Sequence, residues 1–291
     1  MFDLRYHVAS LAAVFLALVI GILVGVGISD QGLVDSAKRS LLQQRVTRLQ
    51  SELDAASKTS ALSQREQRAA QVYMNESYPV LVRNRLRDKR IAVVSIGSGD
   101  RGVRSTVERT LTDSGALEAR FRALKLPLDL KTIESKLRAS QVGAAYAGRS
   151  KLQTLGQALG DELVSGGETP LWDALTDTLI EERVGGSEEP VDGVIVARPA
   201  PPQRGATSKF LLGLYQGLDS AAVPAVGAET TTSATSAVDA FRAGGLSSVD
   251  DVDKPAGKLA LVLLLAGAPA GQYGIKVTAD QSLPPFVPAR G

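Results

Sequence analysis

The stretch KRIAVVSIGSGDRG, residues 89–102, decides the fold. Its apolar run, residues 91–96, is short, rich in β-branched side chains and bounded by charged residues and glycines, which predicts a buried strand. The glycines that follow predict a tight turn, and residues 103–114 then have the spacing of an amphipathic helix that ends before Gly115. A strand that leads through a glycine turn into a helix indicates an α/β fold.

The chain after this stretch keeps alternating between strand and helix patterns. The sequence predicts strands at 116–126, 192–199 and 223–228, helices over most of 150–183 and at 208–220 and 233–243, and a helix or strand at 256–266. Such alternation predicts a Rossmann-like domain over residues 88–266, with a mostly parallel sheet covered by helices on both faces. Residues 267–291 are rich in glycine and proline and are expected to form a C-terminal tail.

Gly97, Gly99 and Gly102 have the spacing of a dinucleotide-binding fingerprint and are the candidate cofactor-binding residues. The acidic residue expected about 20 positions later is missing, because residues 121–124 read FRAL. Asp100 also places a carboxylate where a phosphate would bind. A plain tight turn is therefore favoured, with a nucleotide-binding enzyme as the alternative.

The side chains that most catalytic sites need are scarce in this sequence. The chain has no Cys, and its one His, His7, adjoins the apolar N-terminal segment, which excludes thiolate sites and His-based triads in the domain. The acidic pairs 161/162, 181/182, 188/189 and 250/251 lie in loops or at helix ends and are expected to be solvated. We therefore expect no catalytic residue, no metal site and no cofactor. Residues 230–236, TTTSATS, predict a polar loop that caps the next helix, with phosphate or glycan binding as the alternative.

Residues 8–28 carry no charge, and 21 residues in a helix rise about 31 Å, close to the thickness of a bilayer core. A cleaved export signal has a shorter apolar region and a small-residue cleavage site, and a soluble core helix carries more polar residues. The sequence therefore predicts one transmembrane helix at 8–28, preceded by a short tail at 1–7. The flanking charges do not decide the orientation, since Lys and Arg counts and the residues nearest the span favour opposite directions.

Small residues recur on one face of this span, at Ala13, Ala17, Gly21 and Gly25. Such a row lets two helix backbones approach closely in lipid, which predicts self-association through this face. The alternative is that glycine and alanine are simply common in membrane helices.

Residues 33–78 predict a helical stalk that Pro79 closes. Leu42, Val46, Leu49 and Leu53 step by four and three, as in a coiled-coil seam. We expect a parallel homodimer, with a single solvated helix as the alternative. Residues 31–90 hold 12 Lys and Arg against 6 Asp and Glu, but the basic run at 83–90 indicates a solvated turn rather than a nucleic-acid site.

The motif LRYHVASLAAVFLAL at residues 4–18, the GxxxG of residues 21–25 and the layout of span, short coiled coil and α/β domain resemble the actinobacterial copper transporter family typified by mycobacterial copper transport protein B, MctB. The resemblance implies copper homeostasis and export across the cell envelope. It also implies, through SteB-like members, a septation factor whose domain lies outside the cytoplasmic membrane. A cytoplasmic SteA-like partner would then meet the N-terminal end, and Arg5, Tyr6 and His7 are the candidates for this contact, with interfacial anchoring as the alternative.

The residues themselves offer little to copper. Cu(I) prefers thiolate and thioether ligands and Cu(II) prefers imidazole, yet the chain has no Cys, one His and two Met, Met1 and Met74. No run of alternating ten-residue strands indicates a β-barrel channel. We therefore expect a non-catalytic, dimeric, single-pass protein of the cell membrane, with most of the chain outside the cytoplasm and copper implied by the resemblance alone.

Overall fold

The computed structural model describes residues 4–28, 31–97, 101–186, 188–199 and 201–286. The chain divides into two units, Met1–Ala70 and Gln71–Gly291.

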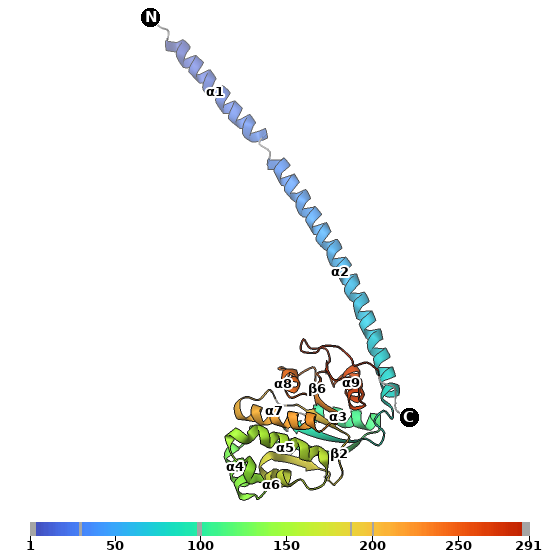
Figure 1. The fold of residues 1–291 in the computed structure, drawn as a ribbon. Coiled ribbons are helices and arrows are strands. Elements are labelled where there is room, and N and C mark those ends of the chain that lie inside the picture. The colour runs from blue at the N-terminus through green and yellow to red at the C-terminus, as the bar shows by residue number, and fades with distance from the viewer. Residues whose placement is uncertain (1–3, 29–30, 98–100, 187, 200, 287–291) are drawn as a thin grey trace. The chain divides into compact units, whose positions relative to one another are not determined.

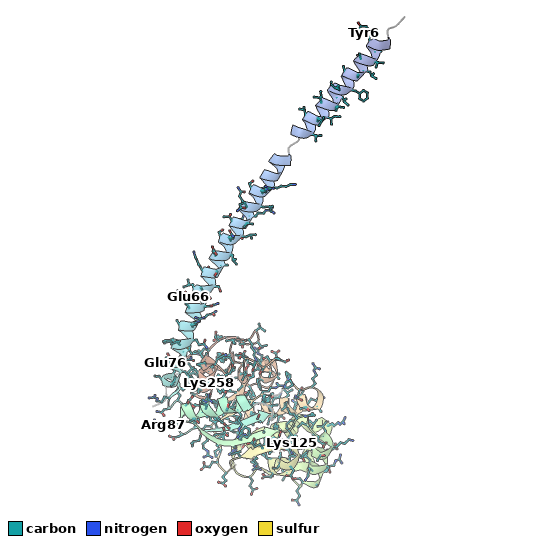
Figure 2. The ribbon with its side chains drawn as sticks, turned by 180° about the vertical axis from the view of Figure 1, so that it is seen from behind. Tyr6, Glu66, Glu76, Arg87, Lys125 and Lys258 are labelled. Atoms are coloured by element: carbon teal, nitrogen blue, oxygen red, sulfur yellow. The ribbon has the colours of Figure 1, made fainter. Side chains whose placement is uncertain are left out.

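The first unit contains helix α1, Leu4–Ile28, and most of helix α2, Gln31–Val82. Among the described residues, one helical segment is long and apolar enough to cross a membrane, Tyr6–Gly27, and none of its side chains is buried. Figure 2 shows side chains projecting from α1 and α2. An apolar helix with no protein around it finds its favourable surroundings in lipid, since leaving so many apolar side chains in water is costly.

The second unit is built on a sheet of seven described strands in the order β3-β2-β1-β4-β5-β6-β7. The strands are β1 Arg90–Ile96, β2 Leu117–Leu124, β3 Ile180–Val184, β4 Gly193–Ala197, β5 Ala225–Ala228, β6 Ser247–Val249 and β7 Gln272–Tyr273. All neighbouring pairs among these strands are parallel except β2 and β3. This arrangement confirms the predicted mostly parallel sheet.

Helices cover both faces of the sheet (Figure 1). The end of α2, with α3 Arg101–Ser114 and α9 Pro255–Leu265, packs on one face. The other face carries α4 Leu130–Ala139, α5 Leu152–Ser165, α6 Pro170–Leu179, α7 Gly205–Ser220 and α8 Val238–Ala243, with the short 3₁₀ turns Gly143–Tyr146 and Arg149–Lys151. Alternate residues of β1 enter opposite cores, Val93 one and Val94 the other, which explains why the strand reads as a continuous apolar run.

Three local predictions were wrong, each for a tertiary reason. Helix α2 does not end at Pro79 but continues to Val82, because Tyr78 and Val82 are buried in the domain core. Residues 180–184 form strand β3 and not the end of a helix, because they pair with β2. Helix α8 begins at Val238 and not at residue 233, because the preceding residues line the carboxyl edge of the sheet.

The apolar segment at 256–266, left open between helix and strand, is helix α9. The sequence did not indicate α4, β6 or β7. Strand β7 lies in the segment expected to be a tail, so the sheet extends beyond residue 266.

Candidate functional site

The strand order contains a switch point, where the connections between strands change from one side of β1 to the other. From β1 the chain adds β2 and β3 on one side, and β4 to β7 then extend from β1 on the other side. In open parallel sheets, ligands bind outside the carboxyl ends of the strands near such a point. The switch point lies between β1 and β4, so the polar residues that follow β4, and those that follow β5 and β6 along the same edge, are the candidates for a site.

Arg198, Glu229 and Asp250 each follow a parallel strand directly. Their backbone N–H groups continue the sheet, donating to Ala228 O (3.0 Å), Val249 O (2.9 Å) and Tyr273 O (3.1 Å) respectively. The strand register therefore places the three side chains in a row along one edge. All three are buried, with exposed fractions of 4%, 1% and 0%.

Glu229 is held by a complete set of donors. Its Oε1 accepts hydrogen bonds from Lys276 Nζ (2.8 Å) and Ser236 Oγ (2.7 Å), and its Oε2 accepts from Ala237 N (2.8 Å). Lys276 Nζ also donates to Thr230 O at 2.8 Å. The buried charge of Glu229 is thus paired and hydrogen-bonded, which a carboxylate in this environment requires.

Asp250 and Asp253 hold the two loops that carry Lys276 and Thr231, beside the ion pair of Glu229 and Lys276. Asp250 accepts from Ile275 N (2.9 Å) and Lys276 N (3.2 Å), which positions the lysine above the sheet edge. Asp253 accepts from both the backbone N (2.7 Å) and the hydroxyl (2.6 Å) of Thr231. Burial favours a higher pKa for Asp253, but the hydrogen bonds from Thr231 hold its pKa below the ordinary value.

Asp251 differs from its acidic neighbours. It is 1% exposed, and no hydrogen-bond donor among the described residues reaches its Oδ1. Burial, followed by the charges of Asp250 and Asp253, raises the pKa of Asp251 to about 6. The expectation that the 250/251 pair is solvated was wrong, because the sheet buries both residues at its edge.

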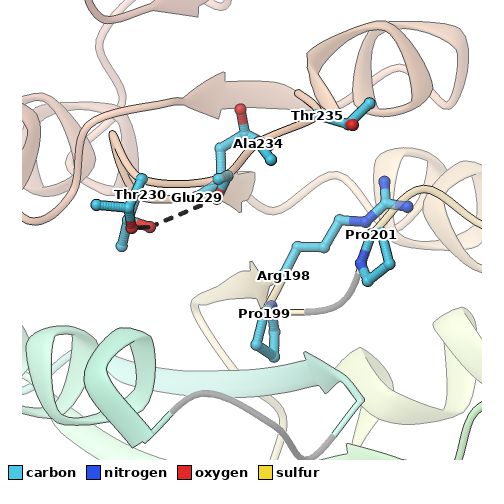
Figure 3. A pocket seen from close by; sticks show the side chains of 9 residues that line it. Arg198, Pro199, Pro201, Glu229, Thr230, Ala234 and Thr235 are labelled. Carbon is cyan, nitrogen blue, oxygen red and sulfur yellow. Dashed lines mark hydrogen bonds between the residues drawn. The ribbon is translucent and has the colours of Figure 1, made fainter.

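A pocket of about 270 Å³ opens beside the Arg198–Glu229 edge. Figure 3 shows the side chain of Arg198 extending from the end of β4 toward Pro201, with Thr230, Ala234 and Thr235 on the loop that follows β5. The lining residues are Arg198, Pro199, Pro201, Glu229, Thr230, Thr232, Ser233, Ala234 and Thr235. The pocket therefore combines a guanidinium with four hydroxyl groups.

Sequence reasoning found part of this site. The polar loop at 230–236 supplies the hydroxyls of the pocket. Ser236 Oγ accepts from Val238 N (3.3 Å), but the N-cap residue of α8 is Ala237, so the predicted hydroxyl cap is not formed. Arg198 and Glu229 were missed. Each is the first polar residue after an apolar strand, which is the signal that could have identified them.

The glycine motif lies elsewhere. Gly97 directly follows β1 and has a φ of 93°, a backbone conformation that favours glycine. Gly102 lies in the first turn of α3. Gly99 lies outside the described residues. Neither Gly97 nor Gly102 is among the residues that line the pocket of residues 198–235.

The residues predicted for association lie on exposed surfaces. A Cβ added at Gly21 or Gly25 would meet no described atom within 4 Å, and Leu42, Val46, Leu49 and Leu53 are exposed. Tyr6 and His7 are also exposed, whereas the side chain of Arg5 is outside the described part. These surfaces are open to a second helix, and their association remains a prediction.

The copper that the sequence resemblance implies would find no clustered ligands in the described part of the chain. No three of its His, Cys, Asp and Glu side chains come together in a group that could hold a metal ion. Three carboxylates of the sheet edge are instead engaged: Glu229 by Lys276, Asp253 by Thr231, and Asp250 by a backbone N–H group.

A family model described as "Copper transport outer membrane protein, MctB" matches residues 1–284. A search of the curated proteins finds no match.

Proposed function

Because the chain belongs to the MctB family of copper transport proteins, we propose that it is a single-span envelope protein that supports copper handling as a non-catalytic scaffold. The observation that carries this proposal is the exposed apolar helix Tyr6–Gly27, attached through α2 to an α/β domain. In this proposal residues 1–7 are cytoplasmic and the domain lies outside the cytoplasmic membrane. The scaffold positions the domain, and copper moves through a partner protein.

Two features support a homodimer. The leucines and valine of the α2 seam are exposed in the single chain, and burying one such side chain stabilises an interface by about 1.5–3 kcal/mol. The row of Ala13, Ala17, Gly21 and Gly25 offers a second contact within the membrane, where close backbone packing drives association. The two contacts follow one another along the chain, so a parallel dimer uses both.

The absence of clustered metal ligands in the described residues supports an indirect role in copper transport. Deletion of the gene is expected to raise cellular copper and copper sensitivity, and the full-length gene is expected to restore both. Elemental analysis of washed cells measures the first quantity. Normal copper content in the deletion strain would contradict the proposal.

The dimer is tested in the same strain with the double variant Gly21→Ile, Gly25→Ile. Isoleucine on the small-residue face separates the two helices, so this variant is expected to restore copper content poorly. Gly27→Ile is the matched control, because Gly27 lies off the four-residue row and is equally free of described neighbours. Equal rescue by both variants would count against the dimer.

A septation role with a cytoplasmic partner is the second candidate. Tyr6 is 78% exposed at the N-terminal end of the span, as a partner contact requires. Replacing Arg5, Tyr6 and His7 by alanine is expected to cause chained or misplaced septa while copper content stays normal. Normal septa in this variant would favour interfacial anchoring instead.

A further inference from the structure

The pocket at the carboxyl edge of the sheet has no part in the scaffold role. It lies where parallel α/β sheets bind ligands, outside the ends of β4 and β5. Its charged groups are held by the sheet itself, because Arg198 and Glu229 each continue the strand ladder through a backbone hydrogen bond. The sheet therefore fixes the backbone positions from which these two side chains extend.

The charges around the pocket favour an anion. Glu229 is neutralised by Lys276, at 2.8 Å, so the carboxylate adds no net negative charge. The other charged group among the lining residues is the guanidinium of Arg198, which is 4% exposed. A guanidinium has five N–H donors and can bind a carboxylate or phosphate while it keeps a partner within the protein.

The remaining lining favours a ligand with hydroxyl groups. Thr230, Thr232, Ser233 and Thr235 each offer a hydroxyl that both donates and accepts. Thr230 Oγ1 lies 3.0 Å from Thr232 Oγ1 and 3.4 Å from Ser233 Oγ, so part of this array is arranged in advance. Prolines 199 and 201 add stiff apolar walls.

The size of the pocket limits the ligand. At about 270 Å³ the pocket lies just below the usual 300–1,000 Å³ of drug-sized sites, which favours a small ligand over a dinucleotide. We propose that the pocket binds a monosaccharide-sized polyol that carries one oxyanion, a phosphate or a carboxylate. Arg198 binds the oxyanion, and the hydroxyls of residues 230–235 bind the polyol.

The experiment is isothermal titration calorimetry on the full-length chain in detergent micelles. Glucose 6-phosphate, glucuronate and neutral glucose are the probes. At least one of the two acids is expected to bind with a millimolar or lower dissociation constant, and glucose at least about tenfold more weakly. Binding of one acid alone identifies phosphate or carboxylate as the group recognised. No heat from either acid up to about 10 mM, or equal binding of glucose, would overturn the proposal.

Two variants locate the binding. Arg198→Gln removes the charge and is expected to weaken binding of the acid at least about tenfold. Since Arg198 is buried, Ala234→Phe provides an independent test: Ala234 is exposed at the pocket, and the larger ring fills it without disturbing the core. Ala240→Phe, at an exposed alanine of α8 outside the lining, is the matched control. Binding that persists in Ala234→Phe would overturn the assignment, and the result does not depend on any copper phenotype.

Discussion

At the scale of single residues, the ion pair of Glu229 and Lys276 is the most informative contact of the sheet edge. Glu229 is 1% exposed, and the lysine joins the loop after β7 to the end of β5. Removing one member of a buried pair leaves the other charge without compensation, which costs more than the pair itself contributes.

Lys276→Met is therefore expected to lower the free energy of unfolding by about 3 kcal/mol. Urea unfolding of the full-length chain measures the loss. Lys209→Met, at an exposed lysine of α7, is the control and is expected to change stability by less than about 0.5 kcal/mol. Glu229→Gln added to Lys276→Met is expected to recover part of the loss, since no buried charge remains. A neutral Lys276→Met would show that the pair contributes little.

The raised pKa of Asp251 predicts that the stability of the domain depends on pH. Its pKa is about 6 in the folded chain, because of burial first and then the charges of Asp250 and Asp253, and about 3.9 when unfolded. Between these values the folded state binds more protons than the unfolded state, so this group adds stability as the pH falls. The gain between pH 7.5 and pH 5 is about 1 kcal/mol.

Urea midpoints at pH 7.5 and pH 5 measure this gain in the natural chain and in Asp251→Asn. The variant is expected to lose the increment, because it has no proton to bind in this range. At still lower pH the trend reverses, since the stability that Asp253 contributes through its lowered pKa is lost as the pH falls through that pKa and its hydrogen bonds to Thr231 are lost. An equal gain in both chains would assign the effect to another group.

At the scale of elements, the contact between α5 and α7 depends on four glycines. A Cβ at Gly156 would collide with Phe210 O, and one at Gly213 with Gln153 O. Gly160 and Gly217 lie one turn further along and meet the facing backbone in the same way. Without side chains at these positions the two helices pack backbone to backbone, side by side in Figure 1.

Gly213→Ala is therefore expected to destabilise the domain by about 2 kcal/mol or more. In an unobstructed helix the same change stabilises by about 0.5–1 kcal/mol, so the sign of the effect identifies the collision. Gly186→Ala is the control, because Gly186 is exposed and a Cβ there meets no described atom within 4 Å. Thermal unfolding followed by circular dichroism measures both, and a stabilised Gly213→Ala would refute the close packing.

The predicted dimerisation of the chain through helix α2 can be tested by substitution in the seam. Leu49→Lys places a charge in the predicted seam and is expected to weaken dimerisation at least about tenfold. Leu62→Lys is the matched control, since Leu62 is similarly exposed but lies off the seam. Sedimentation equilibrium in detergent measures both variants. Equal association of the two would favour a solvated single helix.

At the scale of the whole molecule, the orientation in the membrane is open to a direct test, because the chain has no natural cysteine. A membrane-impermeant maleimide is expected to label Ala139→Cys, on the exposed end of α4, in intact cells. Tyr6→Cys, before the span, is expected to be labelled only after lysis. The opposite pattern would place the domain in the cytoplasm and contradict the proposed scaffold.

The sequence by itself determined the apolar span, the long helix, the α/β class and the mostly parallel sheet. These features depend on local periodicity and hydropathy, which a short window of sequence contains. The hydroxyl-rich loop at 230–236 was also visible, because its composition is local.

Only the tertiary structure decided the site. Arg198, Glu229 and Asp250 are far apart in the chain, and the register of parallel strands brings them to one edge. The 250/251 pair was expected to be solvated, but the fold buries both side chains. Helix α2 continues past Pro79 because its last turn packs in the domain core. The physical reason is the same in each case: strand pairing and burial join residues distant in sequence, and no local pattern encodes which of them will meet.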